Sequence, residues 1–207
     1  MPDQPDRPQI YLVTPPAFAP EVFASRLAAV LDAHPVACLR LALATPDEAA
    51  ILHAADRLRE IAHARDVPLV IDSHFRLVQQ LGLDGVHLPD GARNLRAARK
   101  ALGTEAIIGA FCGTSQHAGL NAGEAGADYV AFGPVAGSAL GSGAVAGRDL
   151  FEWWSEMIEL PVVAEGGLTP ALVEALAPVT DFFAVGAEIW SAEDAALALS
   201  QLMSPIA

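Results

Sequence analysis

Glu165 and the glycine pair that follows it are the residues best placed to do chemistry in this chain. They end a short apolar run, Pro161–Ala164, which is too brief for a helix and is typical of a strand buried on both faces. Thr169 and Pro170 then supply a helix cap and a first helical residue. Backbone N–H groups between such a strand and helix suit a phosphate. The alternative is a tight turn without a ligand.

The Glu165 carboxylate is expected at the mouth of the fold, because its strand is otherwise apolar. Partial desolvation there would raise its pKa and suit it to act as a general acid or base. An ion pair with Arg40 or Arg148 is the competing interpretation. Arg40 lies inside another apolar strand, where a guanidinium is costly unless paired. It therefore either binds an anion or pairs with Asp72.

Carboxylate and imidazole groups also end two neighbouring predicted strands. Asp72 and His74 lie on either side of the end of the third strand, and His87 and Asp90 on either side of the end of the fourth. Such groups could bind a metal or exchange protons. His74 could equally be the first residue of a helix, and Asp90 suits the turn that Pro89-Asp-Gly91 predicts.

The elements that must position these residues alternate regularly along the chain. Eight short apolar strands alternate with eight helical segments, which is typical of parallel βα units. The count predicts a single-domain (β/α)8 barrel over residues 10–207, after a frayed leader at 1–9. An open doubly wound sheet is the alternative. Strands are expected at 10–14, 37–43, 68–72, 85–88, 106–111, 128–133, 161–164 and 181–185, and helices at 21–33, 45–65 (capped by Thr45), 75–81, 94–102, 115–125, 149–158, 170–176 and 192–203.

Ligands of such barrels bind at the carboxyl ends of the strands. One ring of candidate residues follows from this rule. It comprises Arg40, Asp72, His74, His87, Asp90, Phe111, the glycine-rich 134–147 loop, Glu165, Gly166, Gly167, Gly186 and Glu188.

Composition narrows the class of protein. The 207 residues are 53% hydrophobic and 18% charged, which excludes a disordered chain. The net charge of −13 argues against nucleic acid as a partner. We expect a cytoplasmic protein without a membrane segment or signal peptide. Cys38 and Cys112 are predicted to be buried thiols.

Five segments together resemble the superfamily of thiamine phosphate synthases and TenI-type thiazole tautomerases. The most specific is Gly126–Pro134 (GADYVAFGP), and the others are Tyr11–Thr14, Leu39-Arg40, Asp84–Leu88 and Pro161–Gly167. The resemblance implies a (β/α)8 barrel. It also implies one of two activities. The synthase joins hydroxymethylpyrimidine pyrophosphate to thiazole phosphate with Mg²⁺, and the tautomerase isomerises a thiazole carboxylate phosphate without a metal.

The sequence departs from the synthase pattern on one side of the implied site. Cys38–Ala42 keeps the arginine of the synthase motif Gln-Leu-Arg-Glu-Lys but not its lysine, and Ser73 stands where a Mg²⁺-binding aspartate belongs. His87–Gly91 (HLPDG) is closer to the tautomerase form Leu-Pro-Ser-Gly. The histidine of the tautomerase branch aligns with Gly113, so Glu165 would have to transfer the proton.

Metal-independent, tautomerase-like proton transfer on a thiazole-like phosphate is therefore our first hypothesis. The alternatives are a divergent Mg²⁺-dependent synthase and a non-catalytic barrel that binds a phosphorylated ligand. No cofactor is expected unless the synthase alternative holds, in which case Mg²⁺ is needed. The expected ligand is a small phosphorylated heterocycle. The chain could also form a homo-oligomer. The resemblance and the strand ends together assign Glu165 and His87 as catalytic, Gly166, Gly167, Gly186 and Ala187 as phosphate-binding, and Arg40, Asp72, His74, Asp90, Gly133 and Ser138 as substrate-binding.

Overall fold

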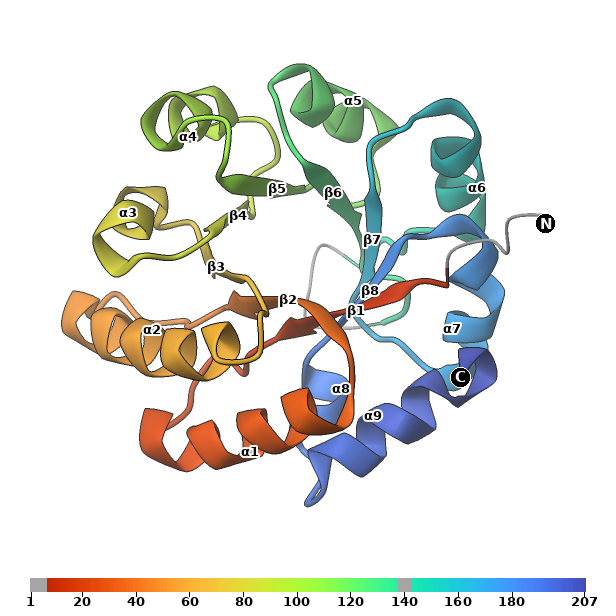
Figure 1. The fold of residues 1–207 in the computed structure, drawn as a ribbon. Helices are drawn as coiled ribbons and strands as arrows, with labels where there is room; N and C mark the ends of the chain where they lie inside the picture. The colour runs from red at the N-terminus through yellow and green to blue at the C-terminus, as the bar shows by residue number, and fades with distance from the viewer. Residues whose placement is uncertain (1–6, 138–142) are drawn as a thin grey trace, which may run out of the picture.

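Eight parallel strands form a closed barrel in a computed structural model that describes residues 7–137 and 143–207. Each strand pairs with its neighbours in sequence, and β1 closes the barrel against β8 (Figure 1). The predicted (β/α)8 barrel is confirmed. The strands are β1 (Gln9–Val13), β2 (Val36–Leu41), β3 (Leu69–Asp72), β4 (Gly85–Leu88), β5 (Ile107–Phe111), β6 (Tyr129–Phe132), β7 (Val162–Glu165) and β8 (Phe182–Val185).

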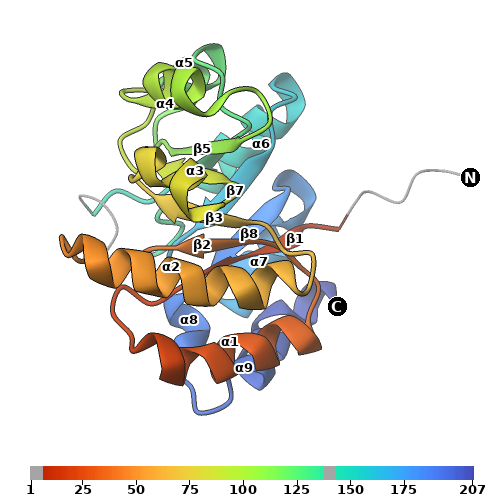
Figure 2. The same cartoon turned by 60° about the vertical axis from the view of Figure 1, so that its left-hand side comes forward.

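The helices surround the barrel, as the two views of the ribbon show (Figures 1 and 2). They are α1 (Pro20–Ala33), α2 (Glu48–His63), α3 (Val78–Leu81), α4 (Leu95–Leu102), α5 (Gln116–Glu124), α6 (Arg148–Met157), α7 (Pro170–Leu176), α8 (Ala187–Trp190) and α9 (Ala195–Met203), with 3-10 turns at Phe75–Leu77, Ala177–Val179 and Ser204–Ile206. None of the helices in the described ranges is long and apolar enough to cross a membrane.

Two helix starts differ from the sequence prediction. Thr45 does not cap α2; Asp47 is the cap, and its carboxylate accepts the Ala49 N–H at 3.0 Å. The last helix begins at Ala195, and the short helix α8 precedes it. The predicted cap at Thr169 is confirmed, since its hydroxyl accepts the Leu172 N–H.

Side chains that alternate along each strand divide the core into two parts. Residues facing outward pack against the helices, with Phe132, Phe151 and Trp154 among the largest that are fully buried. Residues facing inward fill the barrel, and these include Tyr11, Cys38 and the other members Val13, Val70, Tyr129, Ala131, Val163 and Ala184. The inner set is small, and its aliphatic members are only valines and alanines, which leaves room near the mouth for polar side chains.

Aspartates placed before the even-numbered strands anchor the odd-numbered strands beside them. Asp84 accepts the N–H of Leu69 at 2.6 Å, Asp128 accepts that of Ile108 at 2.7 Å, and Asp181 accepts that of Val162 at 2.7 Å. Each contact satisfies a backbone donor at the start of β3, β5 or β7. Three strand pairs are thus fastened at the end of the barrel opposite the mouth.

Replacing Asp181 with Ala should lower the free energy of unfolding by about 1–3 kcal/mol, because the Val162 N–H loses its charged acceptor. Asp181→Asn keeps an acceptor oxygen and should lose less. Urea unfolding of the two variants measures the difference. Equal losses would show that the hydrogen bond itself contributes nothing.

Candidate functional site

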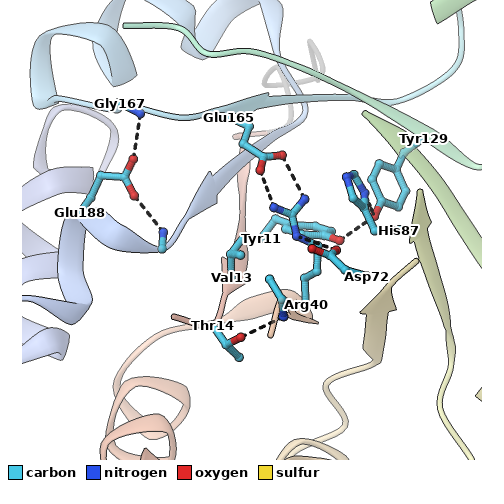
Figure 3. A network of polar contacts seen from close by, with 12 residues as sticks. Tyr11, Val13, Thr14, Arg40, Asp72, His87, Tyr129, Glu165, Gly167 and Glu188 are labelled. Atoms are coloured by element: carbon cyan, nitrogen blue, oxygen red, sulfur yellow. Dashed lines mark hydrogen bonds and ion pairs between the residues drawn. The ribbon is translucent and has the colours of Figure 1, made fainter. Parts of the chain in front are cut away.

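A buried ion pair crosses the interior of the barrel at its carboxyl end. Arg40 on β2 donates to both carboxylate oxygens of Glu165 on β7, one of these contacts being 3.0 Å. Both residues are almost fully buried, with 6% and 5% of their surface exposed. Figure 3 shows the two side chains reaching toward each other. The predicted ion pair of Glu165 with Arg40 is therefore present.

Asp72 at the end of β3 provides a second carboxylate for Arg40. Its Oδ1 lies 3.4 Å from Arg40 Nε, and neither atom has a hydrogen-bond partner among the described residues. Burial works to lower the pKa of Arg40, but the carboxylates of Glu165 and Asp72 outweigh it and raise that pKa well above its usual value. The arginine is therefore permanently charged, and it lies between the carboxylates of Glu165 and Asp72.

The pKa of the Asp72 carboxyl is shifted toward neutrality. Burial raises its pKa to about 6, with Arg40 opposing the shift and Glu165 adding to it. Its side chain remains 30% exposed, so a ligand at the mouth can reach it.

His87 belongs to a separate buried chain of hydrogen bonds. Its Nδ1 lies 2.9 Å from the Tyr129 hydroxyl, which lies 2.5 Å from the Tyr11 hydroxyl. A Cβ on Gly109 would lie 1.9 Å from the Tyr129 ring, so only glycine leaves space for that ring. Burial, and then the charge of Arg40, lower the pKa of His87 well below its usual value. The imidazole is therefore neutral. On the neighbouring strand β3, Asp72 is the residue paired with His87.

The two glycine turns after β7 and β8 lie together, as an anion site requires. Glu188 connects them: its Oε1 accepts the N–H groups of Gly167 at 3.1 Å and Leu168 at 3.2 Å, and its Oε2 accepts that of Gly186 at 2.9 Å. Figure 3 shows the Glu188 carboxylate directed at the Gly167 N–H. Gly166 and Gly167 both have positive φ, +84° and +79°. Ala187 is exposed and begins α8.

The remaining predicted residues are less closely associated. His74 and Asp90 are exposed, and Asp90 accepts a hydrogen bond from Asn94 within its turn. Gly133 is buried, and a Cβ there would lie 2.2 Å from the Glu165 carbonyl oxygen, so it shapes the wall of the mouth. Ser138 lies outside the described residues.

Sequence reasoning did not assign Tyr11 and Tyr129 to the site, and it left the role of Glu188 open. The alternation of side chains along a strand is a signal that could have placed both tyrosines inside the barrel. Burial raises the pKa of each tyrosine well above its usual value, so both remain neutral donors. Cys38 and Cys112 are buried thiols, as predicted, and burial raises the pKa of each to about 12.

A divalent cation would find one or two carboxylates at this rim. Within residues 7–137 and 143–207, no three His, Cys, Asp or Glu side chains lie together as a metal-binding group. Mg²⁺ commonly needs only one or two carboxylates when substrate phosphates complete its shell. Asp72, whose side chain is 30% exposed, and the exposed Asp90 are the carboxylates at this rim that could supply that arrangement.

The Arg40–Glu165 pair should show strong coupling in a double-mutant cycle. Arg40→Met alone leaves a buried carboxylate unpaired and should cost about 3–5 kcal/mol of unfolding free energy. Adding Glu165→Leu should recover about 1–3 kcal/mol relative to the sum of the single losses. Urea unfolding of the four proteins tests this, and additive losses would contradict the pairing.

The Asp72 carboxyl should make stability fall as the pH rises from about 4 to about 6. An unfolded aspartate has a pKa of about 3.9, whereas the folded group titrates at about 6, so the folded state binds more protons in that window. Subtracting the unfolding free energies of Asp72→Asn from those of the wild type isolates this slope. As a control, Asp56→Asn on the exposed face of α2 should keep the pH dependence of the wild type. If Asp72→Asn shows the same pH dependence as the wild type, the raised pKa of Asp72 is excluded.

Comparison with known proteins identifies the family. The model of the TMP-TENI family, described as thiamine monophosphate synthase, matches residues 10–190. A thiamine-phosphate synthase of Rhodospirillum centenum is 43% identical over 188 residues, covering 88% of this chain and 89% of that protein. One from Erythrobacter litoralis is 38% identical over 197 residues, covering 91% of each.

Solved structures agree at the level of the fold. A thiamine phosphate pyrophosphorylase from Pyrococcus furiosus superimposes with a TM-score of 0.81 at 23% identity, covering 95% of this chain and 94% of that one. The resemblance drawn from the sequence motifs is thus confirmed over most of the barrel, and the chain belongs to the thiamine monophosphate synthase family.

Proposed function

We propose that the chain is a thiamine phosphate synthase, which joins a pyrimidine methyl pyrophosphate to a thiazole phosphate with Mg²⁺. Relatives at 36–43% identity carry that name, which favours the synthase alternative over the tautomerase-like hypothesis. In this reaction the thiazole ring nitrogen bonds to the pyrimidine methylene carbon while the carbon–oxygen bond to pyrophosphate breaks. Positive charge appears on the heterocycle, and negative charge leaves with the pyrophosphate.

Asp72 is the observation that carries the proposal. It ends β3 at the mouth, and its side chain is 30% exposed although its Oδ1 faces Arg40. Together with Asp90 it would hold the Mg²⁺ ion, which neutralises charge on a leaving pyrophosphate. Because the Asp72 pKa is about 6, the carboxylate is available for this role above that pH.

The other groups of the rim suit the heterocycles. Glu165 and Asp72 bring more negative charge than Arg40 balances, which favours a ring that becomes cationic. The neutral His87 and Tyr129 offer hydrogen-bonding groups near the same face. The turns at Gly167 and Gly186 offer N–H donors for the thiazole phosphate.

The tautomerase-like hypothesis has weaker support. It needs Glu165 as a proton-transfer group, yet both oxygens of that carboxylate accept hydrogen bonds from Arg40. With both oxygens engaged by a buried arginine, the carboxylate has no free oxygen directed at a ligand proton. Glu165 and His87 are accordingly proposed to stabilise and orient the substrates.

Formation of thiamine phosphate from the two substrates with Mg²⁺, and its loss on adding EDTA, tests the proposal. Asp72→Asn should raise the Mg²⁺ concentration for half-maximal rate at least about tenfold. Asp56→Asn, on the outside of α2, is the matched control and should leave that concentration unchanged. Turnover of a thiazole carboxylate phosphate in the presence of EDTA, without coupling, would instead support the tautomerase. Binding without any turnover would indicate a non-catalytic barrel.

A further inference from the structure

The anion site formed by the two glycine turns already holds an anion of the chain itself. Three N–H groups from two different strand ends converge on Glu188, at 2.9–3.2 Å. Two of them belong to the turn after β7, about 20 residues away in sequence, so the carboxylate does more than cap its own short helix.

The backbone around this carboxylate is closely constrained. A Cβ on Gly167 would lie 3.0 Å from Ala136, and one on Gly186 would lie 3.1 Å from the Val13 carbonyl oxygen. The left-handed φ of Gly167 adds to this constraint, because other residues rarely adopt it. The turns are therefore fixed with their donors directed at one point, and the occupant of that point can change while the backbone stays in place.

A phosphate and the Glu188 carboxylate cannot share these donors. Both are anions, and two like charges at contact distance repel strongly where water is partly excluded. Glu188 is only partly buried and has a flexible side chain, so it can rotate toward solvent and release the three N–H groups.

We infer that Glu188 is a specificity-determining residue that competes with the phosphate of the thiazole substrate for the N–H groups of Gly167, Leu168 and Gly186. The inference rests on the proposed function for the identity of that substrate. A phosphate must exchange with the carboxylate when it binds, so the affinity for phosphorylated ligands is set below what the turns alone would give. An unphosphorylated thiazole alcohol makes no such exchange.

Isothermal titration of Glu188→Gln with inorganic phosphate and with thiazole phosphate tests the inference. The glutamine keeps one acceptor oxygen, but its NH₂ group cannot accept from the remaining N–H, and it lacks the charge that strengthens the hydrogen bonds. Both anions should bind about tenfold more tightly than to the wild type. The thiazole alcohol should gain nothing. Glu193→Gln, an exposed acid a few residues further on, changes the net charge equally and should leave all three affinities unchanged.

Glu188→Ala provides a second measurement. It removes the internal acceptor, so its melting temperature should be lower without ligand and should rise more on adding phosphate than that of the wild type. If both variants bind phosphate no more tightly than the wild type, Glu188 is a structural cap and the inference is wrong. Tighter binding of inorganic phosphate without any thiamine phosphate formation would support the role of Glu188 and reject the proposed function instead.

Discussion

The ion pair between Arg40 and Glu165 is the constraint around which the mouth of this barrel is arranged. A buried charge is tolerated only when it is paired and hydrogen-bonded, and each of these side chains supplies what the other needs. The pair joins β2 to β7 across the interior, so the two sides of the mouth cannot separate without exposing it. Its charge also affects its neighbours, since Arg40 opposes the upward shift of the Asp72 pKa and helps to keep His87 neutral.

The rim around that pair has two unlike sides. On the side of β3 and β4, Asp72 pairs with Arg40 through Oδ1 and keeps part of its side chain exposed at the mouth. On the side of β7 and β8, every donor of the glycine turns that Glu188 reaches is already satisfied. One side thus presents a partly exposed carboxylate, while the other presents backbone donors that an internal carboxylate occupies.

The order of strands and helices could be predicted from the sequence, because apolar runs and helix caps are local signals. Four of the predicted site residues, Arg40, Asp72, His87 and Glu165, do gather within the mouth. The pairing itself was open, since Arg40 and Glu165 are 125 residues apart and closure of a barrel cannot be derived by counting strands.

Other features of the structure could not be predicted from the local sequence. Thr45 and Asp47 are both suitable caps, and only the path of the chain decides for Asp47. The four-residue helix α8 is too short to show a helical period, so Glu188 looked equally like a surface residue. His74 and Asp90 follow the predicted strands and are exposed, because each lies in the loop beyond its strand.

The aspartate contacts beneath the barrel have a consequence for how the chain can be rearranged. Each closes a segment of only 15, 20 or 19 residues, so it forms at little entropic cost and can precede the closure of the whole barrel. Circular permutants opened between these strand pairs would keep all three contacts local. An opening inside a pair would turn one of them into a contact between distant ends of the chain, and would delay it until the barrel is nearly complete.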